Sequence, residues 1–168
     1  MKLETIRLGR IVNAHGIRGE VRVQPEVADP ALLTRFKVFY IGGQRVVPTA
    51  NHVHKGVVLM KFPGVDDMNA ALALKGKFLD IHREDAHLKP GEFFDQELLG
   101  VEVFDCASGA RLGEVTAVEN YPAHQVYTVK GEKEYLIPAV KGAFIESVDI
   151  DANRMEVHVW EGMESDAD

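Results

Sequence analysis

Alternating apolar and polar residues, without a sustained helical period, characterise the first half of the chain. In residues 19–24, valines alternate with polar or charged side chains, and this period of two predicts a strand with one buried face. Gly42–Gly43 lies between two further apolar segments and suits the tight turn of a hairpin. The predicted strands of this half are 3–13, 19–24, 37–41, 44–47, 57–62 and 77–82. Their number and spacing favour a small β-barrel.

Two short helices are predicted between these strands. The first, at 29–33, has Asp29 as a candidate N-cap and Pro30 at the first helical position. The second, at 65–74, begins with acidic residues and ends before Gly76. Four of its apolar residues are predicted to lie near one face: Met68, Ala71, Leu72 and Leu74.

A polar segment without periodicity separates two predicted domains. It contains Lys89-Pro90-Gly91, and we interpret 85–92 as a linker between a domain at 1–84 and a domain at 93–168. Further strands are predicted at 100–105, 111–119, 125–129, 135–137, 144–150 and 155–159. We expect them to close into a second small β-barrel, because an open sheet edge invites unwanted pairing. The acidic end, 161–168, is expected to fray. The fold class is therefore mainly β, with two small β-barrels and short helices.

The composition is that of a folded protein without a membrane helix. The chain has 168 residues, of which 46% are hydrophobic and 27% charged. Its longest uninterrupted apolar run, Ala70–Leu74, is far shorter than the roughly 20 residues that a membrane-spanning helix needs. Charged residues near the start leave no apolar signal segment, and the single cysteine excludes an internal disulfide. We expect a cytoplasmic protein with no membrane partner, and a monomer is the simplest expectation.

The charge is distributed unevenly between the two halves. The chain as a whole has a net charge of −7, which alone argues against general nucleic-acid binding. Residues 1–85, however, contain 13 basic and 9 acidic side chains, a balance of +4. Residues 86–168 contain 6 basic and 17 acidic side chains, a balance of −11. Such an asymmetry indicates that the halves meet different partners. An ordinary acidic protein with a slightly basic half remains an equally weighted alternative.

No pattern of catalytic residues is present. The chain lacks a Gly-x-x-x-x-Gly-Lys-Ser/Thr phosphate loop and a Gly-x-Ser-x-Gly nucleophile motif. Cys106 has no identified histidine partner. His52 and His54 have a spacing that can hold zinc on a strand, but a third ligand is missing and exposed histidines are favoured. We therefore predict a binding protein, not an enzyme, with no metal and no cofactor.

Two other classes of function stay open at this point. One is a small enzyme, such as an RNA-processing enzyme, that uses His15 or the pair of His52 and His54. The other is a general scaffold whose second barrel binds an unrelated protein or a membrane-associated complex. Stoichiometric zinc in the purified protein would favour the enzyme.

The most unusual segment lies between the first two predicted strands. Gly16 and Gly19 bracket the apolar Ile17 and the cationic Arg18, with His15 at the entry. Glycine permits backbone shapes closed to other residues, and loops on a rigid barrel commonly carry function. Nearby arginines could contact phosphates or a carboxylate-rich protein surface: Arg7, Arg10, Arg18 and Arg22. A hairpin whose turn simply requires glycine is an equally weighted alternative.

Several strings of residues resemble the RimM family of ribosome maturation factors. The most specific is His15-Gly16-Ile17-Arg18-Gly19-Glu20-Val21, preceded by Leu8-Gly9-Arg10-Ile11. The resemblance continues in order through Phe62–Asp67 and the helix up to Gly76, Pro90–Gly100, Gly109–Val115, Glu134–Val140 and Val148–Asp151. It therefore covers nearly the whole chain with the spacing of the family.

The resemblance implies a two-domain, non-enzymatic protein. Its first domain would be a six-stranded barrel like those of translation factors, and its second a PRC-type β-barrel. Proteins of this family bind the immature small ribosomal subunit and assist assembly of its head, through the nineteenth protein of that subunit and nearby rRNA. The family often has two tyrosines at the start of the second domain, where this chain has Phe93-Phe94 and lacks both hydroxyls.

The resemblance suggests a role for the charge asymmetry in binding two different partners. We expect the basic half to lie toward rRNA and the acidic half to engage a basic ribosomal protein. Further candidate contacts in the acidic half are Tyr121 and His124, in a predicted turn, and Phe144, beyond the turn at Lys141-Gly142. For each of these residues, and for Phe93 and Phe94, the alternative to a partner contact is a purely structural role.

Overall fold

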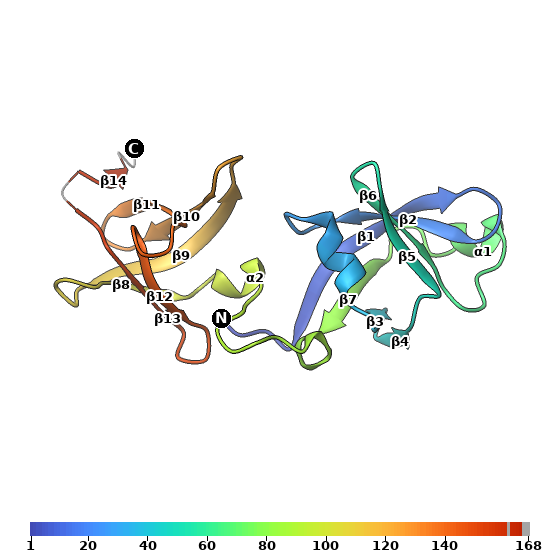
Figure 1. Cartoon of the computed structure of the whole chain (residues 1–168), viewed down its shortest axis with the longest axis horizontal. Helices are drawn as coiled ribbons and strands as arrows, with labels where there is room; N and C mark the ends of the chain where they lie inside the picture. Colours follow the sequence, from blue (N-terminus) through green and yellow to red (C-terminus); the bar gives the residue numbers. More distant parts are fainter. Residues whose placement is uncertain (161, 166–168) are drawn as a thin grey trace. The chain divides into compact units, whose positions relative to one another are not determined.

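A computed structural model describes residues 1–160 and 162–165 and divides the chain into two compact units (Figure 1). One unit comprises Glu4–Leu88. The other comprises Lys89–Asp168 together with Met1–Leu3. The first three residues therefore belong with the second unit, whereas the sequence pattern alone grouped them with the first predicted domain.

The first unit is built around a seven-stranded antiparallel sheet with the order β4-β3-β7-β1-β2-β6-β5. Its strands are β1 (Thr5–His15), β2 (Glu20–Pro25), β3 (Phe39–Ile41), β4 (Gln44–Val46), β5 (Ala50–His54), β6 (Val57–Lys61) and β7 (Phe78–His82). All except β5 overlap predicted strands. The sequence of β5, Ala-Asn-His-Val-His, has no clear apolar face, and the strand forms at the edge of the sheet by pairing with β6.

Alternation along these strands places one set of side chains in a core. Fully buried residues of this set are Ile6, Leu8, Ile11, Val21, Val23, Val58 and Met60. The predicted helix at 29–33 is a 3-10 helix, η1 (Pro30–Arg35), and the Asp29 carboxylate accepts a hydrogen bond from the backbone N–H of Ala31 at 3.0 Å. Leu33 of η1 is fully buried, and its carbonyl accepts a 2.8 Å hydrogen bond from Asn51 of β5. η1 therefore covers the core and anchors the edge strand.

The second predicted helix is shorter than expected. α1 (Met68–Leu72) begins after Asp67, whose side chain accepts a 2.7 Å hydrogen bond from the backbone N–H of Ala70. The residues before Asp67 form a loop, because the cap residue has an extended backbone. Of the four apolar residues predicted to lie near one face, Ala71 is fully buried, whereas Met68 and Leu72 are exposed. The helix therefore presents two apolar side chains to solvent.

The second unit contains a separate seven-stranded sheet with the order β12-β13-β8-β9-β10-β11-β14. Its strands are β8 (Glu102–Asp105), β9 (Arg111–Asn120), β10 (Gln125–Lys130), β11 (Glu134–Pro138), β12 (Ile145–Asp149), β13 (Arg154–Val157) and β14 (Glu164–Ser165). β13 and β8 pair in parallel, and the other neighbours pair antiparallel. The buried core consists of Leu98, Val101, Val103, Val115, Tyr127, Val129, Ile137, Ile145, Ile150, Met155 and Val157.

The prediction of a mainly β chain with short helices is confirmed by these two sheets. Three short elements were not expected: α2 (Asp95–Leu98), the 3-10 helix η2 (Arg83–Ala86), and β14. The prediction that 161–168 frays is wrong at 164–165, because β14 gains backbone partners by pairing with β11; residues 161 and 166–168 lie outside the described residues. Among the described residues, no helix is both long and apolar enough to span a membrane.

Candidate binding surfaces

The turn between β1 and β2 is shaped by its two glycines. Gly16 has φ +71° and open space where a side chain would begin. Gly19 has φ +93°, and a Cβ placed on it would lie 2.0 Å from the carbonyl oxygen of Val65. Only glycine avoids that clash, so this glycine allows the turn to pack directly against the loop that precedes α1.

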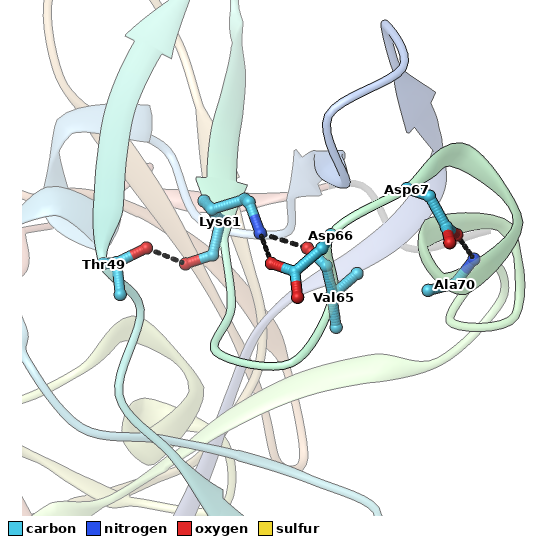
Figure 2. A network of polar contacts seen from close by, with 6 residues as sticks. All are labelled: Thr49, Lys61, Val65, Asp66, Asp67 and Ala70. Carbon is cyan, nitrogen blue, oxygen red and sulfur yellow. Dashed lines mark hydrogen bonds and ion pairs between the residues drawn. The ribbon is translucent and has the colours of Figure 1, made fainter.

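The loop at Val65 is itself anchored by Lys61, the last residue of β6 (Figure 2). The Lys61 ammonium donates a hydrogen bond to the carbonyl oxygen of Val65 and forms a 2.9 Å ion pair with Asp66. The Lys61 carbonyl oxygen accepts a 2.8 Å hydrogen bond from the backbone N–H of Thr49 and a second one, at 3.3 Å, from its hydroxyl. These contacts connect the loop to the end of the sheet, so the β1–β2 turn rests on a well-supported surface.

The turn displays an apolar and a cationic side chain side by side. Ile17 is 73% exposed, and Arg18 is also exposed. α1 packs against β1 and β2, and Figure 1 shows it beside the β1–β2 turn. Met68 and Leu72 of α1 are 42% and 39% exposed, which adds apolar surface to this end of the unit. We call this set of Ile17, Arg18, Met68 and Leu72 the turn surface.

Arg22 has a different role from Arg18. Its guanidinium lies 3.3 Å from Nδ1 of His15, and the His15 ring lies 5.8 Å from the ring of His54. Leu59 is the cross-strand neighbour of Arg22 on the same face of the sheet, and it is only 3% exposed. The Arg22 Nε is buried and has no hydrogen-bond partner among the described residues. The structure therefore brings His15 and Arg22 together in a local cluster that includes His54.

The other two arginines of this region lie on different parts of the sheet. Arg10 is exposed and pairs across β1 and β2 with Gln24, which places it on the same face as Arg22. Arg7 lies over the Phe78 ring, 3.6 Å from its centroid, and 3.7 Å from the Asp80 carboxylate. Arg7 is therefore engaged within the fold, whereas Arg10 and Arg18 extend into solvent.

In the second unit, Phe93 and Phe94 are held close to the core. Phe94 is only 6% exposed, and Phe93 is partly buried against the core cluster. The fully buried carboxylate of Glu97 accepts a 3.0 Å hydrogen bond from the backbone N–H of Phe94 and a 3.1 Å hydrogen bond from that of Leu3. Packing is therefore a clear role of both phenylalanines, and a direct contact with a partner stays a prediction.

Tyr121 and His124 lie at the end of the β9–β10 hairpin. Tyr121 is 52% exposed, and its hydroxyl donates a 2.8 Å hydrogen bond to Glu119, which raises the pKa of the tyrosine and keeps the phenol protonated. His124 is half-buried and lies 3.0 Å from the carbonyl oxygen of Gln125. The Gln125 amide in turn donates a 2.8 Å hydrogen bond to Asp95, directly after Phe94. The structure therefore links the Phe93–Phe94 segment to this hairpin.

The residues considered for catalysis are not arranged for it. Cys106 is exposed, but desolvation, followed by the nearby carboxylates, raises the pKa of its thiol, which disfavours the reactive thiolate. Ser108 donates a 2.7 Å hydrogen bond to Asp105 within a turn. His52 and His54 share one face of β5, yet no group of three metal-ligating side chains occurs within the described ranges.

Two features of these surfaces were missed from the sequence. The first is the exposure of Met68 and Leu72. The apolar spacing predicts that they share a face with the buried Ala71, but spacing does not reveal that the helix ends at Leu72. Trp160 was not singled out, because it follows a predicted strand at the start of an acidic end. It is 56% exposed and lies against Phe144, with ring centroids 4.9 Å apart. An isolated tryptophan next to acidic residues was the available signal.

Comparisons with known proteins assign both units. The model of the RimM N-terminal domain matches residues 6–86, and that of the RimM PRC barrel domain matches residues 95–163. The chain is 38% identical to the ribosome maturation factor RimM of Clostridioides difficile (strain 630), over 96% of this chain and 97% of that protein. It is 37% identical to the protein of the same name from Acetivibrio thermocellus, over 98% of each chain. A crystal structure of a Pseudomonas aeruginosa protein, described as a 16S ribosomal RNA processing protein RimM, covers 93% of this chain and 98% of that one, with 27% identity and a TM-score of 0.46.

Proposed function

Because this chain belongs to the RimM family of ribosome maturation factors, we propose that it binds the immature small ribosomal subunit and assists assembly of the subunit's head. The proposed partners are the nineteenth protein of that subunit and the neighbouring rRNA. We further propose that it acts in the cytoplasm as a monomer, by binding alone, without a catalytic residue, metal or cofactor.

The observation that supports this proposal best is the turn surface. Ile17 is largely exposed although the turn that bears it is anchored through Gly19 and Val65. Burial of an exposed isoleucine on a partner is favourable, and a pre-ordered turn loses little conformational entropy when it binds. Arg18 beside it can donate hydrogen bonds to a phosphate or a carboxylate. The turn is therefore suited to binding a macromolecule.

The charge balance supports different partners for the two units. The +4 balance of residues 1–85 favours contact with rRNA phosphates, and Arg10 and Arg18 are exposed cations there. The −11 balance of residues 86–168 favours contact with a basic ribosomal protein. Complementary charges accelerate encounter, so the association rate should fall as salt rises. A rate that is insensitive to salt would contradict this electrostatic part of the proposal.

Cosedimentation with ribosomal particles tests the proposal. Small-subunit precursors from cells that lack this factor should retain the protein in a gradient, and large subunits should not. The Arg18→Ala variant should bind the precursors about tenfold more weakly, because it loses a charge-assisted contact. Its thermal melt should be unchanged, since Arg18 is exposed.

The matched control removes another exposed cation of the first unit. Lys37→Ala lowers the charge of that unit by the same amount and leaves the turn surface intact. Its binding should stay within about twofold of the wild-type value, because distant exposed charges are screened by salt. Equal weakening by both variants would indicate that only net charge matters. Normal binding by Arg18→Ala would leave the turn with a structural role alone.

A further inference from the structure

The second unit presents an aromatic pair that the proposed function has not used. The rings of Phe144 and Trp160 lie 4.9 Å apart between centroids, with 37° between their planes. Phe144 is partly buried against the core of the unit, whereas Trp160 is 56% exposed. One ring therefore supports the other, and the tryptophan offers a large aromatic surface to solvent.

The position of this pair is determined by backbone contacts. The backbone N–H of His158 donates a 2.7 Å hydrogen bond to the carbonyl oxygen of Phe144. On the far side, the backbone N–H of Met163 donates a 3.2 Å hydrogen bond to the carbonyl oxygen of Trp160, and the Trp160 N–H contacts the Met163 sulfur at 3.4 Å. These contacts flank Trp160 along the chain on both sides.

Acidic residues lie on the segments next to the pair. Asp105 lies close to the backbone N–H of Val159, the residue before Trp160. Glu146, two residues after Phe144, forms a 2.8 Å contact with His158, two residues before Trp160. Glu156 lies on β13, four residues before Trp160. Acidic residues therefore lie on the segments that carry the aromatic pair, in a part of the chain, 86–168, whose balance is −11.

Two of these carboxylates contact basic side chains, since Glu146 contacts His158 and Glu156 contacts Arg154. Arg154 forms a 3.3 Å ion pair with Glu156, and its guanidinium lies over the ring of Phe104, 3.7 Å from the centroid. This arrangement shows, within the same unit, how a guanidinium fits between an aromatic ring and a carboxylate. Within residues 1–160 and 162–165, guanidinium groups lie over the rings of Phe78 and Phe104 and none lies over Trp160.

We propose that the Phe144–Trp160 pair is a docking site for an arginine or lysine side chain of a basic protein, an inference that rests on the proposed function. A tryptophan face attracts cations more strongly than the other aromatic rings do, and the −11 balance of residues 86–168 reinforces that attraction. The same negative balance repels phosphates, so a basic protein and not rRNA is the partner that fits. A large aromatic side chain supported from below is also the residue type enriched at interface hot spots.

Trp160 allows a direct test, because it is the only tryptophan of the chain. Its fluorescence in the wild-type protein should shift and lose accessibility to acrylamide when small-subunit precursors are added. Trp160→Leu, which keeps an apolar side chain but removes the ring, should bind the precursors about tenfold or more weakly. Trp160→Phe, which keeps an aromatic face, should lose less than about threefold. Thermal melts should be close to that of the wild type, since the residue is exposed.

A control and a cross-linking experiment complete the test. Leu136→Ala removes a side chain of the same unit that is 46% exposed and lies in β11, and its binding should not change. A benzophenone cross-linker at position 160 should attach to a small-subunit protein.

The following outcomes would contradict the inference. Cross-linking to rRNA alone would overturn the inference. Wild-type binding without a fluorescence change, or unweakened binding by Trp160→Leu, would overturn it while the proposed function stands. Failure of the wild-type protein to bind the precursors would overturn both.

Discussion

Gly19 and the carbonyl group of Val65 are packed so closely that no side chain fits between them. A Cβ on Gly19 would lie 2.0 Å from the Val65 oxygen and 2.6 Å from its carbonyl carbon. The two residues are far apart in sequence and belong to the two most recognisable motifs of the first unit, 15–21 and 62–67. The motifs are therefore two sides of one contact, which orders the turn that presents Ile17.

We expect Gly19→Ala to destabilise the protein more than Gly16→Ala. Both positions have positive φ, so each alanine introduces backbone strain of about 1 kcal/mol. At Gly19 the methyl group also clashes with Val65 backbone atoms, which raises the expected loss to about 2–4 kcal/mol. Urea unfolding measures both values. Equal losses at the two sites would show that the turn does not depend on its contact with Val65.

Glu97→Gln should destabilise the second unit. The Glu97 carboxylate is fully buried and accepts hydrogen bonds from the backbone of both Leu3 and Phe94. A glutamine would turn an NH₂ group toward one of these donors and leave it unsatisfied, at a cost of about 1–3 kcal/mol. Hydrogen exchange should rise at the amides of Leu3 and Phe94 in particular.

The control for this prediction is another carboxylate of the second unit. Glu102 pairs with Arg111 at 3.2 Å, and about half of its side chain is exposed. An exposed ion pair contributes little, so Glu102→Gln should change the free energy of unfolding by less than about 1 kcal/mol. If both variants unfold alike, the buried carboxylate has no special role in holding the Phe93–Phe94 segment.

Local patterns predicted the strands better than the contacts between them. The alternation in 19–24 and the glycine pair at 42–43 act over neighbouring residues, and the corresponding strands β2, β3 and β4 form there. β5 was missed because its polar residues have no apolar alternation, and its partner β6 determines its pairing. A hydrogen bond between Glu97 and Leu3 joins residues 94 positions apart, and no periodicity reports such a contact.

The candidate site shows the same limit. The unusual glycines of the β1–β2 turn were visible in the sequence, but their partner Val65 was not. Four arginines were grouped as one basic set, although the fold engages Arg7 with Phe78 and Arg22 with His15. Residue type indicated which side chains could bind anions, and only the tertiary contacts distinguish those that are free to do so.

Cys106 should be alkylated slowly for an exposed cysteine. Desolvation and the neighbouring carboxylates raise the pKa of its thiol, so at any pH near neutrality a smaller fraction is thiolate than in the unfolded chain. The pH profile of the iodoacetamide reaction should therefore have its midpoint at higher pH in buffer than in denaturing urea. Glu146→Gln should lower the midpoint of the folded protein part of the way, whereas Glu132→Gln, in the exposed β10–β11 turn, should not. Identical midpoints in buffer and urea would contradict the prediction.

Arg22 should stabilise the first unit through its hydrocarbon stem more than through its charge. Its Nε is buried without a hydrogen-bond partner among the described residues, while Leu59 on the same face is almost fully covered. Arg22→Met keeps a side chain of similar length and removes the unsatisfied group, so stability should be retained or rise. Arg22→Ala uncovers Leu59 and should lose about 1–2 kcal/mol in urea unfolding. Arg10→Ala, at an exposed position on the same face, is the control and should unfold like the wild type. A loss in Arg22→Met as large as that in Arg22→Ala would instead assign the stabilisation to the guanidinium and its contact with His15.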